Sequence, residues 1–312
     1  MKPAGPSLAL ALAVGLLAAG CRESGARIDP GTISARRDSL KAYFAERYSA
    51  FEKGNWDAWA GEMVDSAFLI AAEPGRALSG RDSILAAMRA DYAPAFAAGL
   101  TLHVASDSQD IWLDDSARVA AVTTDLDYQV SIQEQHVPLR LRVTTLLGRD
   151  SAGWKILVEH YSRAIEYDSL FMALMGRQVR APAAVGQSVS PAAGELINQF
   201  RRDLKDFSKA KFAEDAVVVT PGEIARGAAA ARGALATWLG LPGNATEANT
   251  GIRVALAPGS RTGWLATTLY VPIFAGPESA VAPIRVLLIY HVAGDHWEIV
   301  QAHFSVGWTP RS

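Results

Sequence analysis

The segment Trp154-Lys-Ile-Leu-Val-Glu-His-Tyr-Ser162 returns near the carboxyl end of the chain as Trp297-Glu-Ile-Val-Gln-Ala-His-Phe-Ser305. Tryptophan, isoleucine, histidine, an aromatic residue and serine stand in the same order in both segments. Internal similarity of this kind indicates a tandem repeat, in which each half of the chain folds on a similar scaffold. We therefore expect two related domains that each end in the same strand, with His160 and His303 at equivalent places.

The first residues predict a targeting segment. Lys2 gives a positive start, a mostly apolar run extends from Leu8 to Ala19, and small residues precede Cys21, the only cysteine of the chain. The run is too short to span ~30 Å of hydrocarbon as a helix. It resembles a bacterial lipoprotein signal, which implies cleavage before Cys21, acylation of that residue and, because Arg22 follows in place of aspartate, an outer-membrane protein facing the periplasm. The alternatives are an uncleaved anchor or an ordinary signal peptide with an incidental thiol.

Composition divides the rest of the chain. After the signal peptide of residues 1–21, we expect a polar tether at 22–35, a first domain at 36–175, a linker at 176–193 and a second domain at 194–312. The linker segment is rich in proline, alanine, glycine and serine and has no apolar periodicity. The 30 Lys and Arg against 32 Asp and Glu, without a basic run, argue against a nucleic-acid partner.

The order of the expected elements predicts an α+β fold. The first half has a helical pattern that stops at Gly54-Asn55, then a shorter helix with the apolar stripe Trp56, Trp59, Ala60, Met63 and Val64. A third helix follows Gly80, and β-rich runs continue to Ser162. Helices followed by antiparallel strands indicate a curved sheet with one face wrapped by helices. In the second half the residues between Leu204 and Glu214 are too few and too polar for a full second helix, so this copy is eroded and its pocket either open or collapsed.

Several short features then indicate a family. The helix that ends at Gly54-Asn55, the Asp65-Ser66-Ala67 turn, the lead Leu78-Ser79-Gly80-Arg81 and the final Trp154 to Ser162 strand together resemble the SnoaL-like branch of the nuclear transport factor 2-like superfamily. The resemblance implies a cone, a strongly bent antiparallel sheet closed by N-terminal helices around a pocket. Members include isomerases, dehydratases, epoxide hydrolases, polyketide cyclases and pockets with no known reaction. Dimerisation through the sheet face is common among them, and two copies in one chain can make that contact as an intramolecular pseudo-dimer.

The resemblance also locates possible catalytic positions. Ketosteroid isomerases of this superfamily carry a tyrosine on the first helix, a base carboxylate and a protonated carboxyl, and these roles fall on Arg47, Ala71 and Thr145. None of the three residues can perform them. Tyr48 and Glu73 lie close in sequence, but a slip of one residue in a strand turns its side chain to the other face. The resemblance therefore favours a protein that does not catalyse this reaction.

Histidine and aspartate residues remain as weaker catalytic candidates. His160 alternates with Val158 and Ser162 on a strand face that we expect to line the pocket, where it would act as a general base or a polar ligand contact. Alternatively, it is a hydrogen-bonded, buried histidine that orders the strand. Asp125 and Asp127 project together and form either an acid/base pair or part of an outer sheet face. Arg142 and Arg285 are expected to point outward and to pair with acids or line a domain interface.

The expected ligand pocket combines aromatic and thioether side chains with the two repeated histidines, although a stripe at helical spacing is also typical of plain core. The predicted pocket residues are Tyr48, Trp56, Trp59, Met63, His160 and His303. The histidines show no paired-ligand spacing on one helix, so the sequence predicts no metal and no cofactor.

Two functional hypotheses follow. The first is a cell-envelope lipoprotein that binds a small apolar molecule or an envelope protein without catalysis. The second is a SnoaL-like lyase, isomerase or hydrolase for a small hydrophobic substrate, which would use His160 with Asp125 or Tyr48. They differ in whether these polar groups converge inside one pocket.

Overall fold

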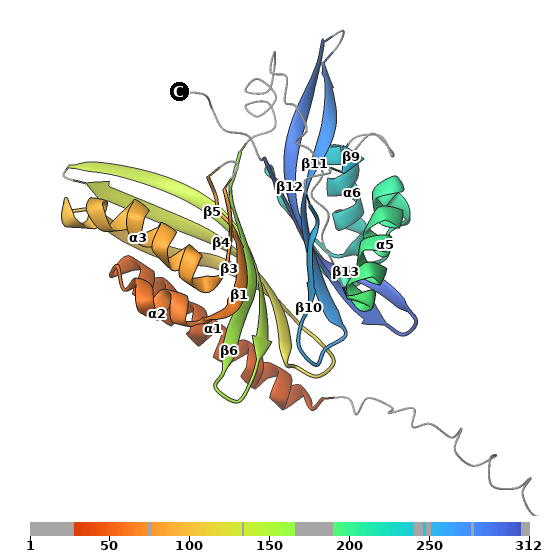
Figure 1. Cartoon of the computed structure of the whole chain (residues 1–312), viewed down its shortest axis with the longest axis horizontal. Coiled ribbons are helices and arrows are strands. Elements are labelled where there is room, and N and C mark those ends of the chain that lie inside the picture. The colour runs from red at the N-terminus through yellow and green to blue at the C-terminus, as the bar shows by residue number, and fades with distance from the viewer. Residues whose placement is uncertain are drawn as a thin grey trace, which may run out of the picture.

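The computed structural model of the chain describes residues 28–73, 76–132, 134–165, 190–239, 246–247, 251–275 and 278–306. The predicted signal peptide, Cys21 and residues 176–189 of the predicted linker lie outside these residues. Within the described part, the chain forms two α+β units, each a sheet with helices against one face (Figure 1). A search of the described helices for a membrane-spanning segment finds none of sufficient length and apolarity.

The first unit contains three helices and a six-stranded sheet in the order β2-β1-β6-β5-β4-β3. All neighbouring strands are antiparallel except β1 and β6, which run parallel. Its elements are α1 (Pro30–Glu52), α2 (Trp56–Gly61), β1 (Met63–Ile70), β2 (Ala77–Ser79), α3 (Arg81–Ala97), β3 (Thr101–Leu113), β4 (Val119–Ile132), β5 (Gln135–Arg149) and β6 (Trp154–Arg163).

Local residue chemistry sets the ends of the first helices. The Asp29 side chain accepts a hydrogen bond from the Thr32 amide at 3.1 Å, and Pro30 follows at a position where its missing N–H costs nothing. Gly54, at a φ of 65°, takes the left-handed conformation just beyond α1. The Asn55 side chain then caps α2 by accepting from the Ala58 amide at 3.2 Å. These contacts confirm the predicted helix end at Gly54-Asn55.

The prediction that Met63 and Val64 continue the second helix is wrong. α2 ends at Gly61, and β1 begins at Met63 because the main chain pairs here with the last strand of the unit. The Ile156 amide donates to the Glu62 carbonyl oxygen at 2.8 Å, and Met63 lies opposite Ile156 in the sheet. Met63 is buried through strand pairing, which the apolar spacing of the sequence does not distinguish from a helical stripe.

The second unit repeats the sheet topology of the first with fewer helical residues. Its strand order β8-β7-β13-β12-β11-β10 matches that of the first sheet, and β9 also pairs with β11. Between α5 and β7 there is only the short 3₁₀ helix η1, which confirms the predicted loss of a second helix. The elements are α5 (Pro191–Lys205), η1 (Phe207–Lys209), β7 (Phe212–Val219), β8 (Ile224–Arg226), α6 (Ala228–Leu239), β9 (Thr246–Glu247), β10 (Arg253–Leu256), β11 (Thr262–Ala275), β12 (Glu278–Ala293) and β13 (His296–Val306).

The two sheets face each other, and the helices lie on the outer sides of the molecule (Figure 1). Phe68 of β1 stacks on Trp264 of β11, with ring centroids 5.7 Å apart and planes inclined by 8°. At another point of the interface, Arg226 pairs with Asp110 at 2.9 Å. One buried apolar cluster includes side chains from both sheets. The two units therefore pack sheet against sheet within one chain.

Candidate functional site

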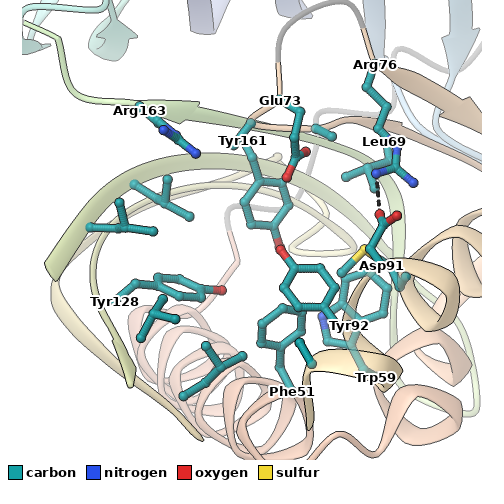
Figure 2. A pocket seen from close by; sticks show the side chains of 18 of the residues that line it. Phe51, Trp59, Leu69, Glu73, Arg76, Asp91, Tyr92, Tyr128, Tyr161 and Arg163 are labelled. Carbon is teal, nitrogen blue, oxygen red and sulfur yellow. Dashed lines mark hydrogen bonds and ion pairs between the residues drawn. The ribbon is translucent and has the colours of Figure 1, made fainter. Parts of the chain in front are cut away.

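The first unit encloses a pocket between its helices and the inner face of its sheet. The cavity measures about 310 Å³, a size suited to a small molecule. Phe51, Trp59, Tyr92, Tyr128 and Tyr161 contribute aromatic rings to its wall (Figure 2). Aliphatic side chains complete most of the remaining surface: Leu69, Leu78, Met88, Leu100, Leu102, Val130, Leu139 and Leu141.

Phe51 is the centre of the aromatic part of this wall. Its ring centroid lies 5.9 Å from that of Trp59, 5.5 Å from that of Tyr92 and 6.0 Å from that of Tyr128. The inclined arrangement is favourable for aromatic rings and fixes their positions before any ligand arrives. The pocket is therefore a preformed apolar surface with phenolic hydroxyl groups at a few points.

Charged side chains contribute to the pocket lining as well. Arg76, which precedes β2, forms an ion pair with Asp91 of α3. Glu73 and Arg163 line the same cavity from the end of β1 and the end of β6 (Figure 2). The ion pair joins two elements that border the cavity, although its half-exposed position limits its stabilising effect.

A buried ion pair lies behind the pocket wall. The Glu159 carboxylate accepts a hydrogen bond from Arg47 Nη2 at 2.7 Å, and both side chains are inaccessible to solvent. Glu159 also accepts from the Thr145 hydroxyl at 3.3 Å and the Tyr161 hydroxyl at 3.4 Å. Arg47 further donates to the Trp59 carbonyl oxygen. Because Tyr161 lines the pocket, its hydroxyl group connects the cavity to the buried carboxylate.

Burial and hydrogen bonding have opposite effects on the pKa of the Glu159 carboxyl group. Burial raises the pKa of Glu159 above its usual range, whereas Arg47 and the hydroxyl donors of Thr145 and Tyr161 limit the rise. Burial likewise raises the pKa of Tyr161 well above its usual value, and the Glu159 charge adds to that effect. Tyr161 therefore stays protonated and acts as a hydrogen-bond donor.

Two of the three isomerase-like positions meet at Glu159. Arg47 and Thr145 contact the same carboxylate, and Ala71 lines the pocket. Ala71 has no side-chain group that can take a proton, and the Glu159 carboxylate is already engaged by Arg47. The geometry thus holds a polar cluster in place without supplying a mobile base at the family position.

Of the side chains predicted from the helical stripe, Trp59 lies in the pocket and the others do not. Trp56 packs on the outer side of the aromatic cluster, with its ring 5.4 Å from Phe96. Met63 belongs to the buried core of the unit. Tyr48 is buried next to β3 and borders a separate hollow on the far side of α1.

The prediction that His160 and His303 line a pocket is wrong, since both lie between the two sheets. Their rings stack with centroids 3.9 Å apart. His160 Nε2 is 2.7 Å from the Ser305 hydroxyl oxygen, and His303 Nε2 is 2.7 Å from that of Ser162. His303 Nδ1 lies 3.0 Å from the Thr144 hydroxyl oxygen. The alternative interpretation, a buried and hydrogen-bonded histidine, describes their surroundings.

A β-bulge explains this error. The register between β5 and β6 shifts after Leu146 pairs with Val158 and Leu147 with Ile156, which leaves Leu157 unpaired. The extra residue reverses the alternation of the strand. Trp154 and Ile156 therefore belong to the core of the first unit, whereas Val158 packs in the cluster between the sheets.

Asp125, the other catalytic candidate, also lies away from the pocket. Arg140 binds its carboxylate with two hydrogen bonds, at 3.0 and 2.6 Å. Asp127, two residues along β4, is exposed. Tyr128 of β4 lines the cavity, and by the alternation of the strand Asp125 and Asp127 point to the opposite face of the sheet. The two aspartates thus lie on the outer face of the sheet, which is the second of the two interpretations. Neither aspartate forms a hydrogen bond with His160.

The buried core of the described part of the second unit contains large aromatic side chains. Phe200, Tyr290 and Phe304 are almost completely buried there. The Tyr290 hydroxyl donates to the Asp203 carboxylate at 2.9 Å, so this buried acid has a partner from the facing strand. The prediction of an open or a collapsed pocket in the eroded copy also depends on residues 240–245 and 248–250, which lie outside the described residues.

The repeat carries a sequence signal for Glu159 and Tyr161 in the positions at which its two copies differ. Where the first copy has Glu159 and Tyr161, the second copy has Ala302 and Phe304. His160 and Ser162 are unchanged between the copies because both sheets use them in their shared interface. Differences between the copies, rather than identities, therefore mark the pocket.

Within the described residues, no three His, Cys, Asp or Glu side chains come together as metal ligands would. The pocket is lined by carbon-rich side chains, and its nearest buried carboxylate is held by Arg47.

Comparison with known proteins finds a family match within the first unit. Residues 40–166 match the sequence profile of the SnoaL-like domain. This part of the chain is thus similar in sequence to SnoaL-like domains. A search of curated proteins returns no match.

Among solved structures, Aln2 from a Streptomyces species is 17% identical, with 46% of this chain and 96% of that chain covered and a TM-score of 0.37. A protein of Catenulispora acidiphila in complex with S-DNPA is 13% identical, with 45% and 98% covered and a TM-score of 0.38. A putative dehydratase from the NTF2-like family of Streptomyces avermitilis is 16% identical, with 42% and 99% covered and a TM-score of 0.37.

Proposed function

We propose that this protein is a cell-envelope lipoprotein whose SnoaL-like domain binds a small, largely apolar molecule without catalysing a reaction. The observation that supports binding is the preformed cavity of about 310 Å³, lined by aromatic and aliphatic side chains. The placement of the polar candidates supports the absence of catalysis. His160 and Asp125 lie outside the cavity, and Glu159 is bound to Arg47.

Binding is tested with N-phenyl-1-naphthylamine, a neutral aromatic molecule that fluoresces in apolar surroundings. The chain from residue 21 onward, with Cys21→Ser so that it is obtained without lipid, contains every described residue and is titrated with this probe. Ala95 of α3 lines the cavity, whereas Ala93 of the same helix is exposed. We expect Ala95→Phe to weaken binding by about tenfold or more, the equivalent of about 1.4 kcal/mol.

The matched control, Ala93→Phe, adds the same side chain to the same helix and should leave the dissociation constant unchanged. Equal affinities for the two variants would mean that the probe binds elsewhere and would overturn the proposed pocket. No saturable binding to the parent chain would overturn the binding function itself.

The placement in the envelope is a separate part of the proposal and rests on the sequence around Cys21. Acylation of that cysteine would hold the two domains at a membrane surface, since each buried CH₂ contributes about 0.8 kcal/mol. Growth of expressing bacteria with radiolabelled palmitate should label the parent protein and leave Cys21→Ala unlabelled. Equal labelling of both proteins, or of neither, would contradict lipidation at this residue.

One observation favours a catalytic alternative. The Tyr161 hydroxyl lies at the pocket wall, and its single proton, if turned from Glu159 to a substrate carbonyl oxygen, would stabilise negative charge on that oxygen. A lyase, isomerase or hydrolase of this design would convert a bound small molecule over time. It would lose that conversion in Tyr161→Phe while still binding the molecule, which mass spectrometry of the released compound would detect.

A further inference from the structure

Two arginines related by the repeat reach across the interface between the sheets. Arg142 of β5 donates from Nη1 to the carbonyl oxygens of Thr220 and Pro221, both at 2.8 Å. Arg285 of β12 donates from Nη1 to the carbonyl oxygen of Ala71 at 2.7 Å and to that of Glu73 at 2.9 Å. Each unit therefore binds the main chain that follows the first strand of the other unit.

The two contacts have different surroundings. Ala71 and Glu73 line the cavity of the SnoaL-like domain, and the Ala71 amide is bonded to the Arg76 carbonyl oxygen at 3.1 Å. Thr220, the equivalent of Ala71, has the matching bond from its amide to the Glu223 carbonyl oxygen at 2.9 Å. It belongs to the unit whose described core includes the buried Phe200 and Phe304. Of the two contacts, that of Arg285 reaches the wall of the pocket described above.

Arg285 is held in place on its other side as well. Its Nε donates to the Ser305 hydroxyl oxygen at 3.1 Å, and that oxygen lies 2.7 Å from His160 Nε2. Burial lowers the pKa of Arg285 to about 10, so the guanidinium remains charged at neutral pH. A buried charged donor bonded to two carbonyl oxygens fixes the positions of those oxygens, because leaving the donor without partners costs more than an ordinary hydrogen bond.

We infer that Arg285 of the second unit is a positioning residue for the ligand pocket of the first, and that the second unit serves as a built-in support for that pocket. Arg285 holds the carbonyl oxygens of Ala71 and Glu73 and thereby sets this part of the cavity wall. This inference rests on the proposed binding function for its effect on affinity, although the positioning itself can be measured without a ligand.

Amide hydrogen exchange measures the positioning directly. Arg285→Gln should increase exchange at the Ala71 amide and leave that at the Thr220 amide unchanged. Arg142→Gln, which removes the equivalent contact, should do the reverse. The crossed pattern identifies two separate supports, whereas equal increases at both amides in both variants would show a general loosening of the interface and overturn the inference.

Ligand affinity then shows whether the positioning matters for the site. We expect Arg285→Gln to weaken binding of N-phenyl-1-naphthylamine about fivefold or more, the lower end of ordinary coupling between linked sites. Arg142→Gln should stay within about twofold of the parent. Arg285→Lys, which keeps one charged donor but loses the planar fork, should recover part of the affinity.

Two further outcomes separate this inference from the proposed function. Equal affinities for the parent, Arg285→Gln and Arg142→Gln would overturn the role of Arg285 in binding while the pocket stands. If the parent chain does not bind the probe, the proposed function fails, and the exchange at Ala71 and Thr220 still decides whether Arg285 positions the wall.

Discussion

The stacked histidines between the sheets predict that acid destabilises the fold below about pH 6.5. Burial lowers the pKa of His160 well below its usual value, and the neighbouring His303 and Arg285 add to the effect. Burial likewise lowers the pKa of His303, assisted by Arg285 and Arg142. Each histidine is therefore neutral in the folded chain and binds a proton in the unfolded chain once the pH falls below the unfolded pKa.

The sign and size of the effect follow from linkage. Because the unfolded state binds more protons, the free energy of unfolding is greatest above the unfolded histidine pKa and falls as the pH decreases. With an unfolded pKa of about 6.5, each histidine lowers the free energy of unfolding by about 1.4 kcal/mol when the pH falls from 8 to 5.5. The two histidines together lower it by about 2.8 kcal/mol. This holds while both rings stay neutral in the folded state over that range.

Urea unfolding at several pH values, followed by tryptophan fluorescence, measures this effect. The informative quantity is the change between pH 8 and pH 5.5 in the parent minus the change in the double variant His160→Gln/His303→Gln. The subtraction removes contributions from other groups, including Glu159, whose raised pKa acts in the opposite direction. The exposed His136→Gln serves as the control and should retain the full pH dependence of the parent.

A pH dependence in the double variant equal to that of the parent would refute the reasoning. It would mean that the two histidines bind protons equally well in the folded and unfolded chains. The absolute stability of the double variant does not enter the comparison, because the loss of the stacked rings is the same at both pH values.

Three further predictions concern packing and hydrogen bonding. Glu159→Gln should lower the free energy of unfolding by about 3 kcal/mol because it leaves the Arg47 charge buried without its partner. The double variant Arg47→Met/Glu159→Leu should recover most of this loss. A double variant as unstable as Glu159→Gln would contradict this prediction. A double-mutant cycle of Phe68→Ala and Trp264→Ala should give a coupling of about 1 kcal/mol across the interface, and simple additivity would argue against direct stacking. Asp114→Ala should lower the free energy of unfolding, measured by thermal unfolding, by about 2 kcal/mol. The Asp114 carboxylate accepts two backbone amide hydrogen bonds, each at 2.9 Å, and the variant loses both. An unchanged stability would show that water replaces the carboxylate.

The sequence was sufficient to predict the architecture because the repeat is carried by residues with a shared structural role. His160 with Ser305, and His303 with Ser162, form matching hydrogen bonds across the interface, so the constraint acts on both copies. The missing second helix could also be predicted, since the number of residues between Leu204 and Glu214 limits what can fold there. For Arg142 and Arg285 the sequence predicts either pairing with acids or a place at a domain interface, and both bind main-chain carbonyl oxygens across the interface.

The site was harder to predict because one inserted residue in β6 decides which face of the sheet each of the following side chains points to. Alternation along β6 predicts that His160 lies with Ile156, and the bulge at Leu157 reverses this relation. Glu159 was not selected because its partner Arg47 comes from α1, far away in sequence, and no spacing rule connects them. A comparison of the two copies at the positions of Glu159 and Ala302 would have indicated that the polar cluster around Glu159 has no counterpart at Ala302.

Native mass spectrometry of the protein purified gently from its own host shows whether the cavity holds a ligand. The account predicts that the parent retains a defined small molecule, that Ala93→Phe retains the same molecule, and that Ala95→Phe, which fills the cavity, does not. A molecule retained equally by Ala95→Phe, or none retained by the parent and by Ala93→Phe, would contradict a ligand pocket in the first unit.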